Sequence, residues 1–282
     1  MTTRLLPLLL LLALPLAARA GEFIVEPGTT FSYSDPAGLC RIDAGHSQKE
    51  ADLLAMFEAA DGETLVSLLT LYDCPFVESL TTATPGEPAL WVRIVTARQG
   101  GQLVVLPLDR KEFLEQIGGE LETVLGGQAG PDLENVLQKA VERVNQEVAP
   151  TSPGGFQLSK VEPLGILARD ADALYAGIVG VVSLGGDQAT VLTLLGVTQL
   201  EGRPITVYLS RPYTGAEMVP PQLEETRVMV ADLIQRNDPE GGAGSEAGGF
   251  DWGRIALYAA IGAGIGLIAA LLLRARKRRG AG

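Results

Sequence analysis

The sequence predicts an α+β fold, with antiparallel sheets and packed helices, that is held outside a membrane by one C-terminal transmembrane helix. Short apolar segments separated by turn residues predict strands, and they follow one another in groups. Segments with the apolar spacing of a helix lie between these groups. Antiparallel runs with helices between them are typical of α+β folds rather than doubly wound parallel ones. A 19-residue apolar run near the C-terminus, 255–273, is long enough to cross a bilayer and predicts the anchor.

The first 20 residues predict a secretory signal peptide. Arg4 precedes an almost unbroken apolar stretch, 5–16, and Ala18-Arg19-Ala20 follows as a small-residue cleavage site. The alternative is a second membrane helix. The short apolar stretch and the Ala-x-Ala site favour the signal peptide, so the mature chain is expected to begin near Gly21.

Residues 21–150 predict an N-terminal α+β half. Short strands lie within 23–42 and are broken by Pro-Gly and Asp-Pro-Ala-Gly turns. Ser47 and Glu50 then form a capping box, which opens a helix to about Ala60 with Gly62 at its C-terminal end. The continuous apolar run 65–72 follows and predicts a buried strand.

The rest of this half predicts a β-hairpin and a helical hairpin. Residues 89–97 and 103–106 are expected to pair around a Gly-Gly turn. Asp109 caps a helix whose apolar stripe consists of Phe113, Leu114, Ile117, Leu121, Val124 and Leu125. A second helix is predicted over 131–148, after a glycine-rich connection.

Residues 151–237 predict a four-stranded antiparallel meander and a closing helix. The strands are expected at about 156–167, 174–184, 189–200 and 205–210, with Asp- and Gly-containing turns between them. Val191–Leu195 is apolar on both faces, which predicts a central strand. The closing helix begins at Pro220-Pro221 and runs to about Arg236, with Leu223, Val230, Leu233 and Ile234 facing inward.

The C-terminal segments predict a tethered topology. Residues 238–252 form a Gly-, Glu- and Ala-rich flexible linker, 253–273 the transmembrane helix, and 274–282 a basic tail. By the positive-inside rule the tail lies in the cytoplasm, on the evidence of Arg274, Arg276, Lys277, Arg278 and Arg279. Gly262 and Gly266 are spaced for close helix packing, which suggests self-association or a partner helix.

Charge and cysteine usage agree with export. All 34 acidic residues and 14 of the 22 basic residues lie between the leader and the membrane helix, so the ectodomain has a formal charge of −20. Such a surface excludes nucleic acid and anionic lipid headgroups as partners. In an oxidising compartment the pair Cys40 and Cys74 predicts a disulfide, because no Cys-x-x-Cys spacing or companion histidine suggests metal or redox chemistry. No site for a cofactor or a metal is predicted.

Catalytic motifs are weak throughout. His46 is the single histidine and lies near Asp43 and Ser47, but a Ser-His-Asp triad needs a geometry that neighbours on a turn rarely reach. Asp170 and Asp172 would begin a calcium loop, although a polar hairpin turn explains them better. Lys160 on a predicted strand is expected on the solvated face. No catalytic residue is assigned.

Two stretches resemble known groups of proteins. Leu39-Cys40-Arg41-Ile42-Asp43, followed by a helix, an apolar strand and Asp73-Cys74, resembles small uncharacterised families of bacterial exported proteins over about 40 residues. That resemblance implies a disulfide-containing exported domain and no activity. The C-terminus, with Gly248-Gly249, a membrane helix and a basic cluster, is similar to glycine-glycine sorting tails cut by a rhomboid-type protease. Residues 250–254 separate the glycines from the helix here, which favours a permanent anchor.

Taken together, the sequence predicts a single-pass protein of the inner (plasma) membrane with its domain in the periplasm. The leading hypothesis is a binding or assembly module that acts on proteins near the membrane, of unknown ligand. The alternative is a membrane-tethered periplasmic hydrolase whose active site, built from carboxylates or a serine, is not identified. A signalling receptor is disfavoured because the nine-residue tail, 274–282, holds no output domain.

Overall fold

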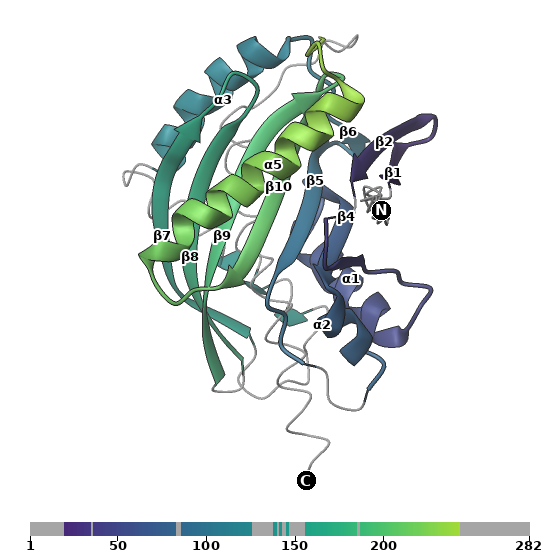
Figure 1. Cartoon of the computed structure of the whole chain (residues 1–282), viewed down its shortest axis with the longest axis vertical. Helices are drawn as coiled ribbons and strands as arrows, with labels where there is room; N and C mark the ends of the chain where they lie inside the picture. The colour runs from purple at the N-terminus through teal and green to yellow at the C-terminus, as the bar shows by residue number, and fades with distance from the viewer. Residues whose placement is uncertain are drawn as a thin grey trace, which may run out of the picture.

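The computed structural model describes residues 20–34, 36–82, 86–125, 138–139, 141–142, 145–146, 156–184 and 187–242. They form a mixed α+β fold with antiparallel sheets and packed helices, as predicted (Figure 1). A two-stranded sheet pairs β1 (Ala20–Glu26) with β2 (Thr29–Ser34). The main sheet has eight strands: β3 (Leu39–Arg41), β4 (Leu65–Asp73), β5 (Trp91–Gln99), β6 (Gln102–Leu103), β7 (Phe156–Arg169), β8 (Leu174–Leu184), β9 (Asp187–Leu200) and β10 (Arg203–Pro212).

The two predicted halves share this one sheet. Its order is β3-β4-β5-β10-β9-β8-β7, with β6 paired to β5. The joint is the antiparallel pair of β5 and β10, in which Arg93 faces Tyr208 and Trp91 faces Ser210. Strand β9 lies between β8 and β10, so the prediction of a central strand at Val191–Leu195 is confirmed.

Turn chemistry explains why the meander forms where it does. Leu200 pairs with Arg203, which leaves a two-residue turn of Glu201 and Gly202. Both residues have positive φ, 49° and 77°, the backbone that a tight hairpin requires. Glu201 adopts it without the freedom of glycine, and its N–H donates to the Asp238 carboxylate at 2.8 Å.

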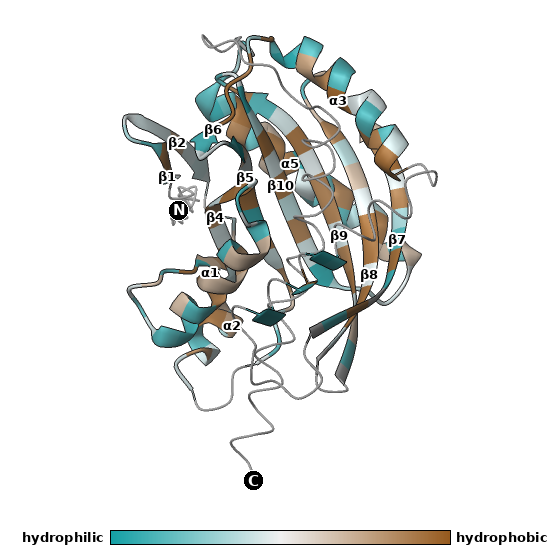
Figure 2. Cartoon of the chain, turned by 180° about the vertical axis from the view of Figure 1, so that it is seen from behind, coloured by the Kyte–Doolittle hydropathy of each residue, from teal (hydrophilic) through white to brown (hydrophobic). Residues whose placement is uncertain are grey.

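Helices cover the two faces of the sheet separately. Helices α1 (Gln48–Asp61) and α3 (Arg110–Leu125) cover one face of the sheet (Figure 2). Their apolar residues share a core cluster with Tyr72, Leu195 and Tyr208. Helix α5 (Val219–Asn237) crosses the other face, where Val230, Leu233 and Ile234 contact Val207 and Leu209 (Figure 1). A short 3₁₀ helix, η1 (Ala216–Met218), precedes α5. The predicted inward faces of α3 and α5 are confirmed.

The helix caps form as predicted. The Ser47 hydroxyl accepts the Glu50 N–H at 3.2 Å, and the Glu50 carboxylate accepts the Asp43 N–H at 2.8 Å. Asp109 accepts the Glu112 N–H at 2.8 Å at the start of α3. Gly62 ends α1 with φ 59°, a conformation that favours glycine.

A charged pair, Arg93 and Asp61, is buried between α1 and the sheet. Arg93 is fully buried on β5, and its guanidinium donates to Asp61 at 2.6 Å and to the Ser67 hydroxyl at 3.0 Å. The guanidinium also lies over the Phe57 ring, 4.1 Å from its centroid. These contacts fix α1 against the sheet, because a buried charge has to be paired.

The β1–β2 hairpin is fastened to α5 by polar contacts. The Asn237 side chain accepts from the Ser32 N–H at 2.6 Å and donates to the Ser32 carbonyl at 2.8 Å. The Asp232 carboxylate accepts from the Ser34 N–H at 2.7 Å and from its hydroxyl at 2.8 Å. The β1–β2 hairpin therefore docks on α5.

Three local expectations differ from the structure. A short helix, α2 (Cys74–Ser79), was not predicted. The strand expected at 103–106 is only the two residues of β6, because the Leu106 N–H turns away to the Gly202 carbonyl at 2.7 Å. Residues 238–242, predicted as the start of a flexible linker, are held by local contacts instead: Asp238 is buried and its carboxylate accepts from the N–H groups of Gly241 and Gly242.

Other predictions lie wholly or mostly outside the described residues. These are the signal peptide up to residue 19, most of the helix predicted over 131–148, the linker from 243 and the segments 253–273 and 274–282. Residues 138–139, 141–142 and 145–146 of the predicted helix are helical, and Val141 is buried. Within the described ranges, no helix combines the length and apolarity that crossing a membrane requires.

Candidate functional site

A pocket of about 370 Å³ opens on the α5 face of the sheet. It lies between the β7–β8 turn, the start of β8, the C-terminal half of α5 and the segment that follows α5. The lining residues are Asp170, Asp172, Ala173, Tyr175, Ala231, Ile234, Gln235 and Pro239. The volume falls near the lower end of typical ligand pockets, about 300–1,000 Å³, which suits a single side chain or a small molecule.

The β7–β8 turn places two carboxylates at the rim. The Asp170 N–H donates to the Ala173 carbonyl at 2.9 Å and closes the turn. Aspartates suit such a turn because their short polar side chains hydrogen-bond locally. Ala173 and Tyr175 come next in the chain and face α5. Both are buried, and they form part of the apolar wall of the pocket.

Asp170 is held by Arg227, which also lies beside Tyr175. The Arg227 guanidinium on α5 donates to Asp170 at 3.1 Å and lies 5.5 Å from the centroid of the Tyr175 ring. Burial raises the pKa of Tyr175 above its ordinary value, and the Asp170 charge adds to the increase while Arg227 opposes it. Tyr175 therefore stays protonated at neutral pH.

Asp172 is held by Arg110, which is itself buried. Arg110 Nη1 donates to Asp172 Oδ1 at 3.1 Å, while the Asp172 side chain is 60% exposed. The same guanidinium donates from Nε to the Gln199 carbonyl at 2.9 Å and from Nη2 to the Asp238 carbonyl, with Asp238 Oδ2 at 3.3 Å. One arginine thus fixes the rim of the pocket and the segment after α5 together.

The arrangement favours a positive ligand group. Asp170, Asp172 and Asp238 place three carboxylates around two guanidinium groups, those of Arg110 and Arg227. Their ion pairs hold the carboxylates in place before any ligand arrives, which is the preorganisation that binding sites use. Apolar walls with a few placed polar groups are the usual make-up of a ligand site.

The alternative reading of Asp170 and Asp172 as a calcium loop is not supported by their contacts. Each carboxylate faces a guanidinium instead of joining other oxygens. Across the part of the chain that the structure describes, no group of three or more acidic, histidine or cysteine side chains is placed to hold a metal ion.

The residues near His46 have structural roles. The His46 side chain is exposed, and the backbone N–H of His46 donates to the Asp43 carbonyl at 3.0 Å. The Asp43 carboxylate accepts the Gly45 N–H at 2.8 Å, and Ser47 serves as the helix cap. Lys160 is exposed on β7, as expected, and donates to Glu162 at 2.8 Å. This hydrogen bond raises the pKa of Lys160.

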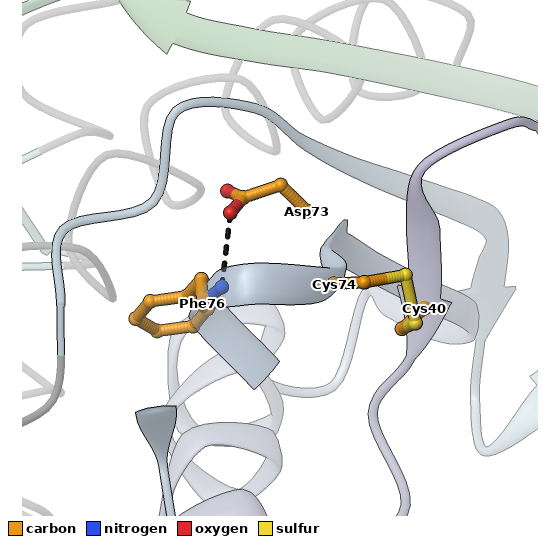
Figure 3. Close-up of a disulfide and its surroundings, with 4 residues drawn as sticks. All are labelled: Cys40, Asp73, Cys74 and Phe76. Atoms are coloured by element: carbon orange, nitrogen blue, oxygen red, sulfur yellow. Dashed lines mark hydrogen bonds between the residues drawn. A yellow bond between two sulfur atoms is a disulfide. The ribbon is translucent and has the colours of Figure 1, made fainter. Parts of the chain in front are cut away.

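The predicted disulfide is present. Cys40 on β3 is bonded to Cys74 at the start of α2, across 34 residues that include α1 and β4 (Figure 3). Asp73 caps α2 by accepting the Phe76 N–H at 3.0 Å, beside the disulfide (Figure 3). The other predicted site residues lie outside the described ranges: Gly262 and Gly266, and the basic cluster Arg274, Arg276, Lys277, Arg278 and Arg279.

Sequence reasoning missed most of the pocket. Tyr175, Arg227 and Gln235 come from segments that only the tertiary fold brings together. Arg110 did carry a signal, because a cation in the first turn of a helix opposes the helix dipole and needs another reason to be there. Its contacts with Asp172 and Asp238 supply that reason.

Comparisons with known proteins give little sequence similarity. The chain matches no family model, and no curated protein matches it. Among solved structures it is similar to the Ran-binding protein Mog1p of Saccharomyces cerevisiae, with a TM-score of 0.29 and 9% identity over 78% of this chain and 95% of that one. It is also similar to cyanobacterial PsbP (CyanoP) of Synechocystis sp. PCC 6803, with a TM-score of 0.30 and 17% identity over 76% and 91%. Both TM-scores are below 0.5, so the functions of these proteins do not transfer to this chain.

Proposed function

We propose that this chain is a binding protein of the extracytoplasmic space, anchored by its C-terminal helix in the inner (plasma) membrane. Its binding site is the pocket beside α5, which receives a side chain of a protein partner near the membrane. The observation that carries the proposal is the pocket itself, with apolar walls from β8 and α5 and two carboxylates fixed at its rim.

The surface next to the pocket supports a protein partner. Val228 is 61% exposed on α5, one of two large apolar side chains exposed to this degree among the described residues. Val228, Ala231 and Gln235 lie on one stripe of the helix, because residues three and four apart are neighbours on its surface. A partner segment that fills the pocket would therefore also cover Val228 and remove its apolar surface from water.

The position of the pocket supports a partner close to the membrane. Pro239 lines the pocket and belongs to the segment that leads toward the predicted anchor. Arg110 fastens that segment to the domain through the Asp238 carbonyl and carboxylate. The pocket thus lies beside Pro239, close in sequence to the predicted anchor.

Site-directed photo-crosslinking in native membranes tests this function. A photoreactive amino acid at Gln235 or Val228 is expected to capture the same protein, identified by mass spectrometry. A photoreactive residue at the exposed Glu115, on α3 and the other face of the sheet, serves as the matched control and should not capture it. Identical products from all three positions, or none from Gln235 and Val228, would overturn the proposal.

A further inference from the structure

We infer that the group which enters the pocket is a basic side chain, with an aliphatic stem and a cationic head. This inference rests on the proposed function and names the chemistry of its ligand. The pocket offers two kinds of surface in the order that such a side chain needs. Ala173, Ala231 and Ile234 line it with apolar atoms, and Asp170 and Asp172 stand at its rim.

The rim retains a free acceptor for a cation. Asp172 Oδ1 is bonded to Arg110, whereas Oδ2 accepts no hydrogen bond from any described residue. The side chain is 60% exposed, so a ligand ammonium or guanidinium group reaches it without moving the protein. Because Arg110 holds the other oxygen, the acceptor is already oriented when the ligand arrives.

The charged groups around the pocket favour a cation over an anion or a neutral group. Arg110 and Arg227 face Asp170, Asp172 and Asp238, so the carboxylates outnumber the guanidinium groups. Arg227 also lies 3.9 Å from Glu224, and Arg236 on the same helix is paired with Asp232. The ectodomain as a whole is strongly acidic, which draws basic segments toward it before they dock.

The apolar walls explain why a side chain with a methylene stem fits better than a bare cation. An exposed ion pair contributes little affinity alone, because water solvates both charges. Lysine and arginine bury their stems along apolar surface and keep the charged head in water. Ile234 and Tyr175 give the stem such a surface.

Ligand-observed NMR with the full chain in detergent micelles tests this inference directly. The probes are N-acetyl-lysine methylamide, N-acetyl-arginine methylamide and the uncharged N-acetyl-norleucine methylamide, each at the same millimolar concentration. Saturation transfer to the stem protons of a basic probe is expected to exceed that to norleucine at least fivefold, and to fall several-fold when NaCl is raised to about 0.5 M.

Three variants test whether the basic probes bind in the pocket. Asp172→Asn should reduce transfer to the basic probes at least fivefold. Ala231→Trp should also reduce transfer to the basic probes at least fivefold, because the indole fills the pocket. This change leaves the Arg110–Asp172 and Arg227–Asp170 ion pairs in place. Glu115→Gln, on the other face of the sheet, removes the same charge and should change nothing. Equal transfer to norleucine, no transfer to either basic probe, or full transfer with Ala231→Trp would overturn the inference.

The two proposals can fail separately. If the photoreactive residue at Gln235 captures one partner while norleucine binds as well as lysine, the binding function stands and the basic ligand is wrong. If the basic probes bind in the pocket but no partner is captured from Gln235 or Val228, the ligand chemistry stands and the protein-binding function is wrong.

Discussion

Arg110 and Asp172 are 62 residues apart in the chain, yet Arg110 Nη1 lies 3.1 Å from Asp172 Oδ1. The arginine is on the first turn of α3, whereas the aspartate belongs to the β7–β8 turn at the rim of the pocket. Because Arg110 also holds Asp238, a single buried guanidinium links α3, the pocket and the segment after α5.

Removing this guanidinium should destabilise the fold. Arg110→Ala leaves the Gln199 and Asp238 carbonyls without their donor and should lower the free energy of unfolding by about 3 kcal/mol. Arg110→Lys should cost less, about 1–2 kcal/mol, because an ammonium group replaces only part of the planar fork. Urea denaturation checks both, with the exposed neighbour Lys111→Ala as a control expected within about 0.5 kcal/mol of wild type. Equal stabilities for Arg110→Ala and Lys111→Ala would show that the guanidinium does not hold these segments together.

Gly196 on β9 should be indispensable for the docking of α5. A Cβ atom at this position would lie 2.5 Å from Val230 Cγ2. Gly196→Ala is therefore expected to lower the free energy of unfolding by about 2 kcal/mol, as overpacked cores do. Adding Val230→Ala should recover part of the loss only if the clash is the cause.

A second glycine provides the opposite control. Gly119 lies inside α3, and nothing would touch its Cβ within 4 Å. Gly119→Ala should raise the free energy of unfolding by about 0.5–1 kcal/mol, because alanine has the higher helix propensity. A destabilising Gly119→Ala, or a neutral Gly196→Ala, would contradict the packing described here.

The disulfide should make a large contribution to stability. The Cys40–Cys74 bond joins residues 34 positions apart. By restricting the unfolded chain, a cross-link of this length should raise the free energy of unfolding by roughly 3–4 kcal/mol. Dithiothreitol should lower the urea midpoint of the wild type. It should leave the Cys40→Ser/Cys74→Ser double variant, already destabilised by a similar amount, unchanged. A wild-type midpoint that does not respond to reductant would mean that the bond is absent or without effect.

Asp232 should make the docking of the β1–β2 hairpin dependent on pH. Partial burial raises the pKa of this carboxyl, but hydrogen bonds from the Ser34 N–H, Arg236 and the Ser34 hydroxyl outweigh burial and hold the pKa below its usual value. A lowered folded-state pKa gives stability that is present above the unfolded pKa of about 4 and is lost as the pH falls through the folded value.

Comparing the wild type with Asp232→Asn measures this effect. At pH 7 the variant should be less stable by about 1 kcal/mol, the usual contribution of a hydrogen bond. The difference in melting temperature should shrink below about pH 4 and vanish once Asp232 is protonated. A constant difference from pH 7 to pH 2.5 would exclude Asp232 as the titrating group.

Local sequence signals found the elements that local chemistry decides. Ser47 with Glu50, Asp109 with Glu112, and the Glu201-Gly202 turn each act within a few residues, and the structure contains all of them. The six-residue helix α2 was missed although Asp73 and Pro75 are ordinary start signals, because so short a helix has almost no apolar periodicity to detect.

The pairing of strands and the pocket depend on contacts that no local signal encodes. Strand β5 pairs with β10 more than 100 residues later, and this pairing merges the two predicted halves into one sheet. The pocket then arises where the β7–β8 turn meets the end of α5. The two aspartates were visible in the sequence as turn residues, but nothing local indicated that Arg110 and Arg227 would be their partners.

The most direct test of this account asks where the folded domain lies. Intact spheroplasts of a bacterial host that express the full chain are treated with an external protease, and the two cysteines are probed by a maleimide gel shift with and without prior reduction. The account predicts that the domain is digested without lysis and that neither cysteine reacts before reduction. A domain that the protease spares until lysis, with both thiols reactive from the start, would contradict it.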